Sequence, residues 1–178
     1  MLGHVGIHVR DLEAQKVFFR DIVGLTVTDE DPEIGIVFMS ARPDEEHHEF
    51  LLCGGRNVGD DARVVQQISF RCNSLEDILD YRQRFLEQDV KFDRIICHGN
   101  AVSIYFFDPE GNRCEVYWDT GLKARQPFGI KIDLTEPKEV LLAKVAEWVR
   151  LYGETGIVGD RAGLAKANLV NQTKAATN

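Results

Sequence analysis

The order of predicted strands and helices repeats once along this chain, and this repeat constrains the fold more than any other feature. Each half predicts one strand, then a helix, then three more strands. The helices begin with similar local sequences, Asp11-Leu12-Glu13 in the first half and Ser74-Leu75-Glu76 in the second, 63 positions later. Because one such unit cannot bury both faces of its own sheet, the economical solution is that two of them pair.

Alternation of apolar and polar residues places the strands, and apolar stripes that follow a capping residue place the helices. The predicted strands of the first half cover residues 2–9, 25–28, 34–40 and 47–53. Those of the second half cover residues 64–72, 91–97, 101–107 and 113–118. The helices end near Gly24 and Gln88. We therefore predict an α+β domain over residues 1–120, in which two βαβββ modules (1–55 and 63–120) pair into an open, cupped mixed sheet.

Residues 121–178 break the repeat and predict a C-terminal extension. The sequence Gln126-Pro127-Phe128-Gly129 predicts a loop, and a helix is predicted at about 136–152. One apolar stripe runs along this helix and is formed by Leu141, Val145, Trp148, Val149 and Tyr152. Such a stripe needs a partner surface, either this domain or another subunit. If the stripe is exposed, it predicts a homo-oligomer, most simply a dimer.

Composition excludes some partners. The net charge is −8 and no cluster of Lys and Arg is present, which argues against a nucleic-acid-binding surface. No apolar run has the length of a membrane helix, and the N-terminus has no apolar signal segment. The four cysteines form no CxxC pair, so we expect reduced thiols and a cytoplasmic protein.

One carboxylate stands in a predicted apolar strand and needs an explanation. The sequence Asp108-Pro109-Glu110-Gly111-Asn112 is typical of a tight turn between two strands. In the strand that follows it, Glu115 lies between Cys114 and Val116. A carboxylate in such a place is costly unless it is paired, hydrogen-bonded or bound to a metal. The hairpin therefore directs attention to Glu115 as a functional residue.

Two stretches, GHVGIHVRDLEAQKVFFRDIVGL near the start and FDPEGNRCEVYW near residue 115, carry a resemblance to a known family. Together with the repeated βαβββ order, they resemble the vicinal oxygen chelate superfamily over residues 2 to about 120. That superfamily contains glyoxalases, methylmalonyl-CoA epimerases, fosfomycin- and bleomycin-resistance proteins and extradiol ring-cleaving dioxygenases. The chain looks most similar to small one-domain members of the ring-cleaving branch.

The resemblance implies a divalent metal held by residues of three strands. His4 matches the ligand of the first strand and Glu115 that of the last strand. Gln67 stands where the family usually has a histidine in the first strand of the second module. Two histidines and a carboxylate suit Fe(II), whereas an amide oxygen is a weaker donor that shifts the preference toward Mn(II). The expected cofactor is therefore Fe(II) or Mn(II).

The resemblance also implies catalytic side chains. His48 matches the acid–base histidine of extradiol enzymes, and His98 resembles a further histidine near their metal. Tyr105 precedes Glu115 by ten residues, the spacing of a tyrosine that hydrogen-bonds the substrate oxygen in those enzymes. The implied function is an extradiol-type dioxygenase, an oxidoreductase that cleaves a catechol-like aromatic ring with O2.

Two alternatives remain open on the sequence. In glyoxalases and epimerases of the superfamily, the fourth strand supplies a further metal ligand, so that His48 would bind metal beside His4, Gln67 and Glu115 in a lyase or isomerase. If Gln67 is instead an ordinary polar residue of the sheet, the chain is a metal-free small-molecule binder of the bleomycin-resistance kind.

Overall fold

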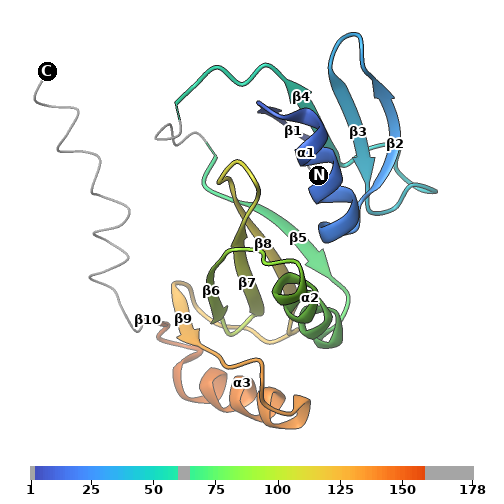
Figure 1. The fold of residues 1–178 in the computed structure, drawn as a ribbon. Coiled ribbons are helices and arrows are strands. Elements are labelled where there is room, and N and C mark those ends of the chain that lie inside the picture. The colour runs from blue at the N-terminus through green and yellow to red at the C-terminus, as the bar shows by residue number, and fades with distance from the viewer. Residues whose placement is uncertain (1–2, 60–64, 159–178) are drawn as a thin grey trace, which may run out of the picture. The chain divides into compact units, whose positions relative to one another are not determined.

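The computed structural model describes residues 3–59 and 65–158 (Figure 1). The first half contains β1 (Val5–Val9), α1 (Leu12–Val17), the π-helical turn η1 (Phe18–Val23), β2 (Thr26–Asp31), β3 (Ile36–Ser40) and β4 (Phe50–Gly54). The second half contains β5 (Ile68–Cys72), α2 (Leu75–Glu87), β6 (Phe92–Cys97), β7 (Ala101–Phe107) and β8 (Arg113–Asp119). The predicted order of strand, helix and three strands is therefore confirmed in both halves.

The strands form two sheets with mixed pairing. The first sheet has the order β1-β4-β3-β2, with β1 parallel to β4 and the other pairs antiparallel. The second has the order β10-β9-β6-β7-β8-β5. The predicted α+β class is confirmed. The division into one domain at 1–120 and an extension remains a prediction.

Several strands begin later than predicted. His4 lies just before β1, His48 lies before β4, and Gln67 lies before β5 rather than inside it. Val64, the predicted first residue of that strand, lies outside the described residues. Before β4, a turn takes the place of the predicted strand end. Glu49 accepts hydrogen bonds from residues 40–42 of that turn. Three of the predicted site residues thus lie immediately before strands.

The prediction for the C-terminal extension is wrong in one respect. The segment predicted as a loop contains the start of β9 (Phe128–Lys131), which pairs antiparallel with β6. Phe128 is almost fully buried, and this burial together with the ladder hydrogen bonds stabilises a short strand that the Pro-Gly pattern concealed. After it come α3 (Lys138–Tyr152) and β10 (Ile157–Val158).

The elements divide into two compact units. The first contains residues 1–70, 79–93 and 104–116 as far as they are described, and the second contains 71–78, 94–103 and the rest from 117. Phenylalanine rings fill the first unit: Phe19 lies 4.6 Å from Phe50, and Phe85 lies 4.5 Å from Phe106, between ring centroids. Phe70 of β5 contacts both Phe19 and Phe50, so residues of both modules share this core.

Helix α1 shows how local sequence sets the entry and exit of a helix. The Asp11 carboxylate accepts a hydrogen bond from the Ala14 amide, which caps the first turn. Gly24 adopts a left-handed φ of 90° and ends the π-helical turn that continues α1. Figure 1 shows α1 beside the strands of the first sheet, and it packs against β3 and β4.

Helix α3 packs its apolar stripe inside the second unit. Leu141 and Val145 are buried, and Trp148, Val149 and Tyr152 are half-buried. A salt bridge between Lys138 at the start of α3 and Glu76 of α2 also lies within this unit. Of the two partner surfaces left open for the stripe, the domain itself therefore covers Leu141 and Val145, while the other three residues stay partly exposed. None of the described helices is long and apolar enough to span a membrane.

Candidate metal centre

Glu115 is the centre of a hydrogen-bonded cluster in the first unit. It lies in β8 and is only 6% exposed. Its Oε2 accepts one hydrogen bond from Gln67 Nε2 at 2.9 Å and another from Ser69 Oγ at 2.5 Å. Gln67 Nε2 also lies 2.9 Å from Ser69 Oγ. The two-residue period of β5 and its approach places Gln67 and Ser69 on the same side, facing β8.

The charge of this cluster is not balanced by a cationic side chain. Both groups that donate to Glu115 are neutral, and no ion pair of Glu115 is found among the described residues. A buried carboxylate is costly unless a positive charge or several hydrogen bonds compensate it. Glu115 therefore has the electrostatic environment in which a bound cation stabilises the structure.

The hairpin that carries Glu115 is held by its own turn. Asp108 accepts hydrogen bonds from the Glu110 and Asn112 amides at 2.9 and 2.7 Å, and from Asn112 Nδ2. Glu110 reaches the first module, where its Oε1 accepts from the backbone amides of Arg10 and Asp11 at the start of α1. The turn residues thus fix β7 and β8 to the helix N-terminus, where a carboxylate is favourable.

His4 and His48 form a second pair of possible ligands. Their ring centroids are 4.5 Å apart, and the His48 ring also contacts the edge of Phe38 at 5.0 Å. His47 Nδ1 lies 2.9 Å from His48 Nδ1, so one of these two nitrogens donates to the other. No hydrogen bond to His48 Nε2 is found among the described residues, so this nitrogen can take a ligand or a proton.

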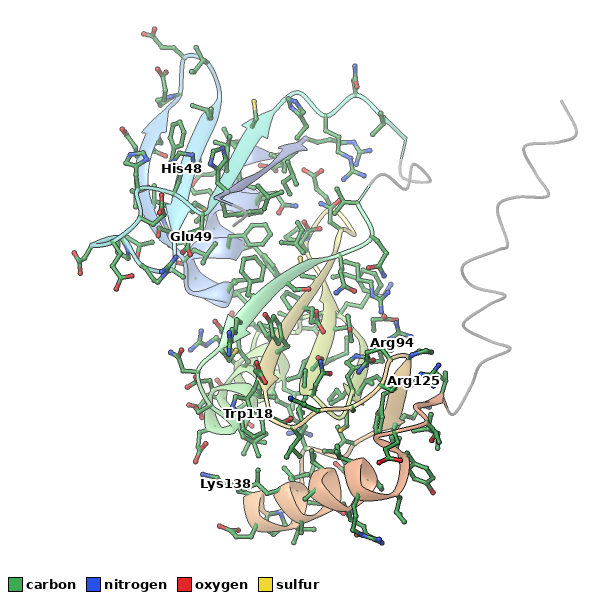
Figure 2. All side chains as sticks on the ribbon, turned by 180° about the vertical axis from the view of Figure 1, so that it is seen from behind. His48, Glu49, Arg94, Trp118, Arg125 and Lys138 are labelled. Atoms are coloured by element: carbon green, nitrogen blue, oxygen red, sulfur yellow. The ribbon has the colours of Figure 1, made fainter. Side chains whose placement is uncertain are left out.

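The segment before β4 is anchored through Glu49, beside His48 (Figure 2). Glu49 Oε1 accepts from the Arg42 guanidinium at 2.8 Å, and Oε2 accepts from the Ala41 amide and the Ser40 hydroxyl. Burial alone would raise the pKa of Glu49, but these hydrogen bonds together lower it. Glu49 therefore stays ionised and fixes the backbone from which His48 projects.

His48 is neutral near pH 7. Burial lowers the pKa of His48 below its usual value, and the positive charges that His4 and His47 can carry lower it further, whereas Glu46 opposes them. A neutral imidazole has a free lone pair, which both metal ligation and proton abstraction require.

The predicted ligands are gathered as two sets rather than one. His4 and His48 form the nitrogen set, and Gln67 joins Glu115 in the oxygen set. In the described part of the chain, no three His, Cys, Asp or Glu side chains form a group that could hold a metal ion. Metal binding by the full predicted set would therefore require His4 to join the Glu115 cluster.

The two other predicted site residues have structural contacts. Tyr105 is buried in β7, with the Arg113 guanidinium 4.5 Å from its ring centroid. In the second unit, His98 Nδ1 donates to the Phe128 carbonyl at 2.7 Å, since a carbonyl can only accept. In a neutral His98 this hydrogen bond places the ring proton on Nδ1.

Ser69 is a site residue that sequence reasoning did not single out. Its hydroxyl makes the shortest contact to Glu115, but a serine on a strand gives no signal of its own. The available signal was its position two residues after Gln67, which puts both on the same side of the strand.

A cavity of about 510 Å³ also lies in the first unit, lined by Gly6 and His8 of β1, Arg56 and Ile68 among others.

The donors present fit a divalent metal. The oxygen set offers the buried carboxylate of Glu115 and the Gln67 carbonyl oxygen, which its hydrogen bond through Nε2 leaves unused. The nitrogen set offers imidazoles. Carboxylate, amide oxygen and imidazole are ligands that Mn(II) and Fe(II) accept, and the uncompensated charge of Glu115 favours a cation.

Two extradiol dioxygenases are among the curated relatives. The chain is 31% identical over 132 residues to a manganese-dependent 2,3-dihydroxybiphenyl 1,2-dioxygenase of Geobacillus genomosp. 3, with 72% of this chain and 39% of that protein covered. It is 27% identical over 123 residues to biphenyl-2,3-diol 1,2-dioxygenase 3 of Rhodococcus globerulus, with 66% of this chain and 63% of that protein covered. The chain therefore spans less than two thirds of the length of either relative.

Solved structures share the fold. A lactoylglutathione lyase of Agrobacterium tumefaciens superposes with a TM-score of 0.53 at 20% identity, covering 66% of this chain and 92% of that one. The fosfomycin resistance protein FosX of Listeria monocytogenes gives 0.52 at 20% identity, with the same coverage. A family model described as the glyoxalase/bleomycin resistance protein/dioxygenase superfamily matches residues 1–116. With the repeated βαβββ order and the DPEGN hairpin, this match shows that the chain belongs to that superfamily.

Proposed function

We propose that this chain is a metal-dependent, extradiol-type dioxygenase that cleaves a catechol-like ring with O2. The observation that carries the proposal is the buried Glu115, which has two neutral hydrogen-bond donors and no cationic partner among the described residues. The relatives named as dihydroxybiphenyl dioxygenases support the reaction class, and one of them is named as manganese-dependent.

In this proposal Glu115 and Gln67 hold the metal together with His4, which joins the Glu115 cluster from the nitrogen set when the metal binds. When bound, such a metal supplies a Lewis acid for the two adjacent hydroxyl oxygens of a catechol and an open position for O2. Gln67 contributes a neutral oxygen where an imidazole would be a stronger ligand, which favours Mn(II) over Fe(II). Ser69 orients the Glu115 carboxylate, and such supporting hydrogen bonds commonly tune metal affinity.

The protein's own groups would handle the protons and the substrate. His48 is neutral near pH 7 and would accept a proton from a catechol hydroxyl at Nε2, later returning it. Tyr105 would donate its phenolic proton to a substrate oxygen, with Arg113 fixing its ring. His98 stays a predicted site residue; in the second unit its Nδ1 donates to the Phe128 carbonyl, which orients its ring. The cavity beside β1 would receive the part of the substrate that carries no hydroxyl groups.

The test begins with the metal content of protein purified without chelators. The apoprotein is then loaded anaerobically with Mn(II) or Fe(II), and 2,3-dihydroxybiphenyl is added with O2. We expect stoichiometric metal and a yellow ring-cleavage product. Absence of product with both ions, over several catechols, would contradict the proposal.

His48→Ala separates the role of a base from that of a ligand. If His48 is a base, we expect this variant to bind metal as the unmodified protein does, with kcat reduced by about 100-fold or more. Loss of metal instead would favour the lyase or isomerase arrangement, in which His48 is a fourth ligand.

The metal-free binder is the second candidate. It is favoured by the lack, in the described residues, of any three-residue His, Cys, Asp or Glu group. Calorimetry of the apoprotein with a catechol that binds without turnover would distinguish the two. Tight binding that is unchanged by Mn(II) and Fe(II) would support the binder and exclude the dioxygenase.

A further inference from the structure

Among the described residues of the second unit, none covers one face of α3. Val140 is 41% exposed and Leu151 is 48% exposed on this helix. The described residues that line a groove on its surface all belong to α3, namely Glu139, Val140, Ala143, Lys144, Glu147 and Trp148. Figure 2 shows side chains of α3 extending away from the strands as well as toward them. This second face differs from the buried stripe of Leu141 and Val145.

The exposed face has a regular order of side chains. Val140, Lys144, Glu147 and Leu151 are spaced by four, three and four residues, which places them in one row along a helix. The row reads apolar, positive, negative, apolar. The midpoint of the row lies between Val145 and Ala146. The apolar residues lie at equal distances on either side of this midpoint, and so do the two charged residues, which have opposite signs.

Such a row is complementary to its own antiparallel copy. When two copies of α3 run antiparallel about that point, Val140 of one meets Leu151 of the other, and Lys144 meets Glu147. Ala143 meets Trp148, and its small side chain leaves room for the indole. Parallel pairing would instead bring two Lys144 side chains together and two Glu147 side chains together, which electrostatic repulsion disfavours.

The charges of the row can take a further partner. Lys144 Nζ already donates to both Glu136 oxygens, at 2.7 and 2.5 Å, and has a third proton to donate. Glu147 is held by the Arg150 guanidinium at 2.7 Å on each oxygen, which fixes its orientation, and each oxygen can accept another bond. Both side chains are about half exposed.

We propose that α3 forms the interface of a homodimer, packed antiparallel against α3 of a second copy. The interface consists of two Lys144–Glu147 ion pairs at its centre, with an apolar Val140–Leu151 contact at each end. In this dimer the two chains contact each other through their second units, and the Glu115 cluster of the first unit is unaltered. The dimer is therefore independent of the proposed activity.

Charge reversal gives a test specific to this pairing. Lys144→Glu places two like-charged pairs at the interface, and Glu147→Lys does the same with the opposite sign. We expect each variant alone to weaken the dimer by at least about tenfold in Kd, measured by analytical ultracentrifugation over a concentration series. A mixture of the two variants, however, restores both ion pairs in a heterodimer, as does the double variant K144E/E147K in a homodimer.

Asp80→Lys is the matched control, because Asp80 is an exposed helical residue of α2. It should leave the Kd unchanged, and circular dichroism should show all variants folded. A monomeric unmodified protein, or a dimer that neither reversal weakens, would overturn the proposal. So would single variants that weaken the dimer but form no heterodimer when mixed.

Discussion

The two βαβββ modules bury their polar side chains in different ways. In the first, Gln15 of α1 is fully buried, and neither its Oε1 nor its Nε2 has a hydrogen-bond partner among the described residues. In the second, buried Glu115 accepts two hydrogen bonds and buried Asp108 accepts three. The second module also holds the buried Ser103 hydroxyl, which has no partner among the described residues, so the contrast is between the unsatisfied Gln15 amide and the organised carboxylates.

The proposed ligands differ in the same way. His4 and His48 of the first module lie outside strands and are held mainly by ring contacts. Glu115 lies within a strand, and its carboxylate is oriented by Ser69 and Gln67 before any metal binds. Preorganised ligands lose less freedom on binding, so the second module should dominate metal affinity.

Glu115→Gln should have the largest effect. It removes the only carboxylate of the proposed set, and we expect the affinity for Mn(II) to fall by at least about 100-fold in calorimetric titration. The unfolding free energy of the apoprotein should not fall by more than about 1 kcal/mol, because the substitution also removes an uncompensated buried charge. The exposed Glu33→Gln is the control and should change neither quantity. An unaltered affinity for Mn(II) in Glu115→Gln would show that Glu115 does not bind the metal.

Gln67→His tests whether the neutral donor Gln67 limits the metal affinity of the oxygen set. Imidazole is the stronger ligand, so the affinity for Fe(II) should rise by about tenfold. Gln66→His adds the same side chain one residue earlier, at an exposed position that points away from Gln67. It should leave the affinity as it is, and an equal gain in both variants would contradict a specific site at Gln67.

The sequence was sufficient for the order of elements and for placing a buried, hydrogen-bonded carboxylate at Glu115, because both depend on local signals. The repeat follows from periodicity, and a lone carboxylate between Cys114 and Val116 is visible in any strand pattern. The grouping of side chains was not predictable in this way. Ser69 becomes a partner of Glu115 only through the register between distant strands, and Phe128 begins a strand only because distant packing buries it. The exposed row of α3 was not predicted, because the stronger apolar stripe beside it dominates the helical pattern.

Gln15→Met should stabilise the first module. The methionine side chain has a similar shape and removes two buried polar atoms that lack partners, so the unfolding free energy should rise by about 1–2 kcal/mol in urea titration. Gln88→Met, at an exposed position beyond α2, should change it by less than about 0.5 kcal/mol. If Gln15→Met destabilises the protein, its amide is satisfied by a bound water, and the contrast between the modules disappears.

Arg42→Gln should have the smallest effect and concerns the anchor of the His48 segment. The folded-state pKa of Glu49 lies below its usual 4.5, so this pair contributes stability above about pH 4.5 that is lost as the pH falls through the folded-state value. Arg42 is exposed, so its contribution to the unfolding free energy at pH 7 should be small, as is usual for an exposed ion pair. Urea titrations from pH 7 to acid should therefore show the difference between Arg42→Gln and the unmodified protein shrinking toward zero, whereas Arg82→Gln should show none at any pH. A difference that persists in acid would mean that Arg42 acts by packing, and that the segment carrying His48 is held less by charge than the hydrogen bonds of Glu49 indicate.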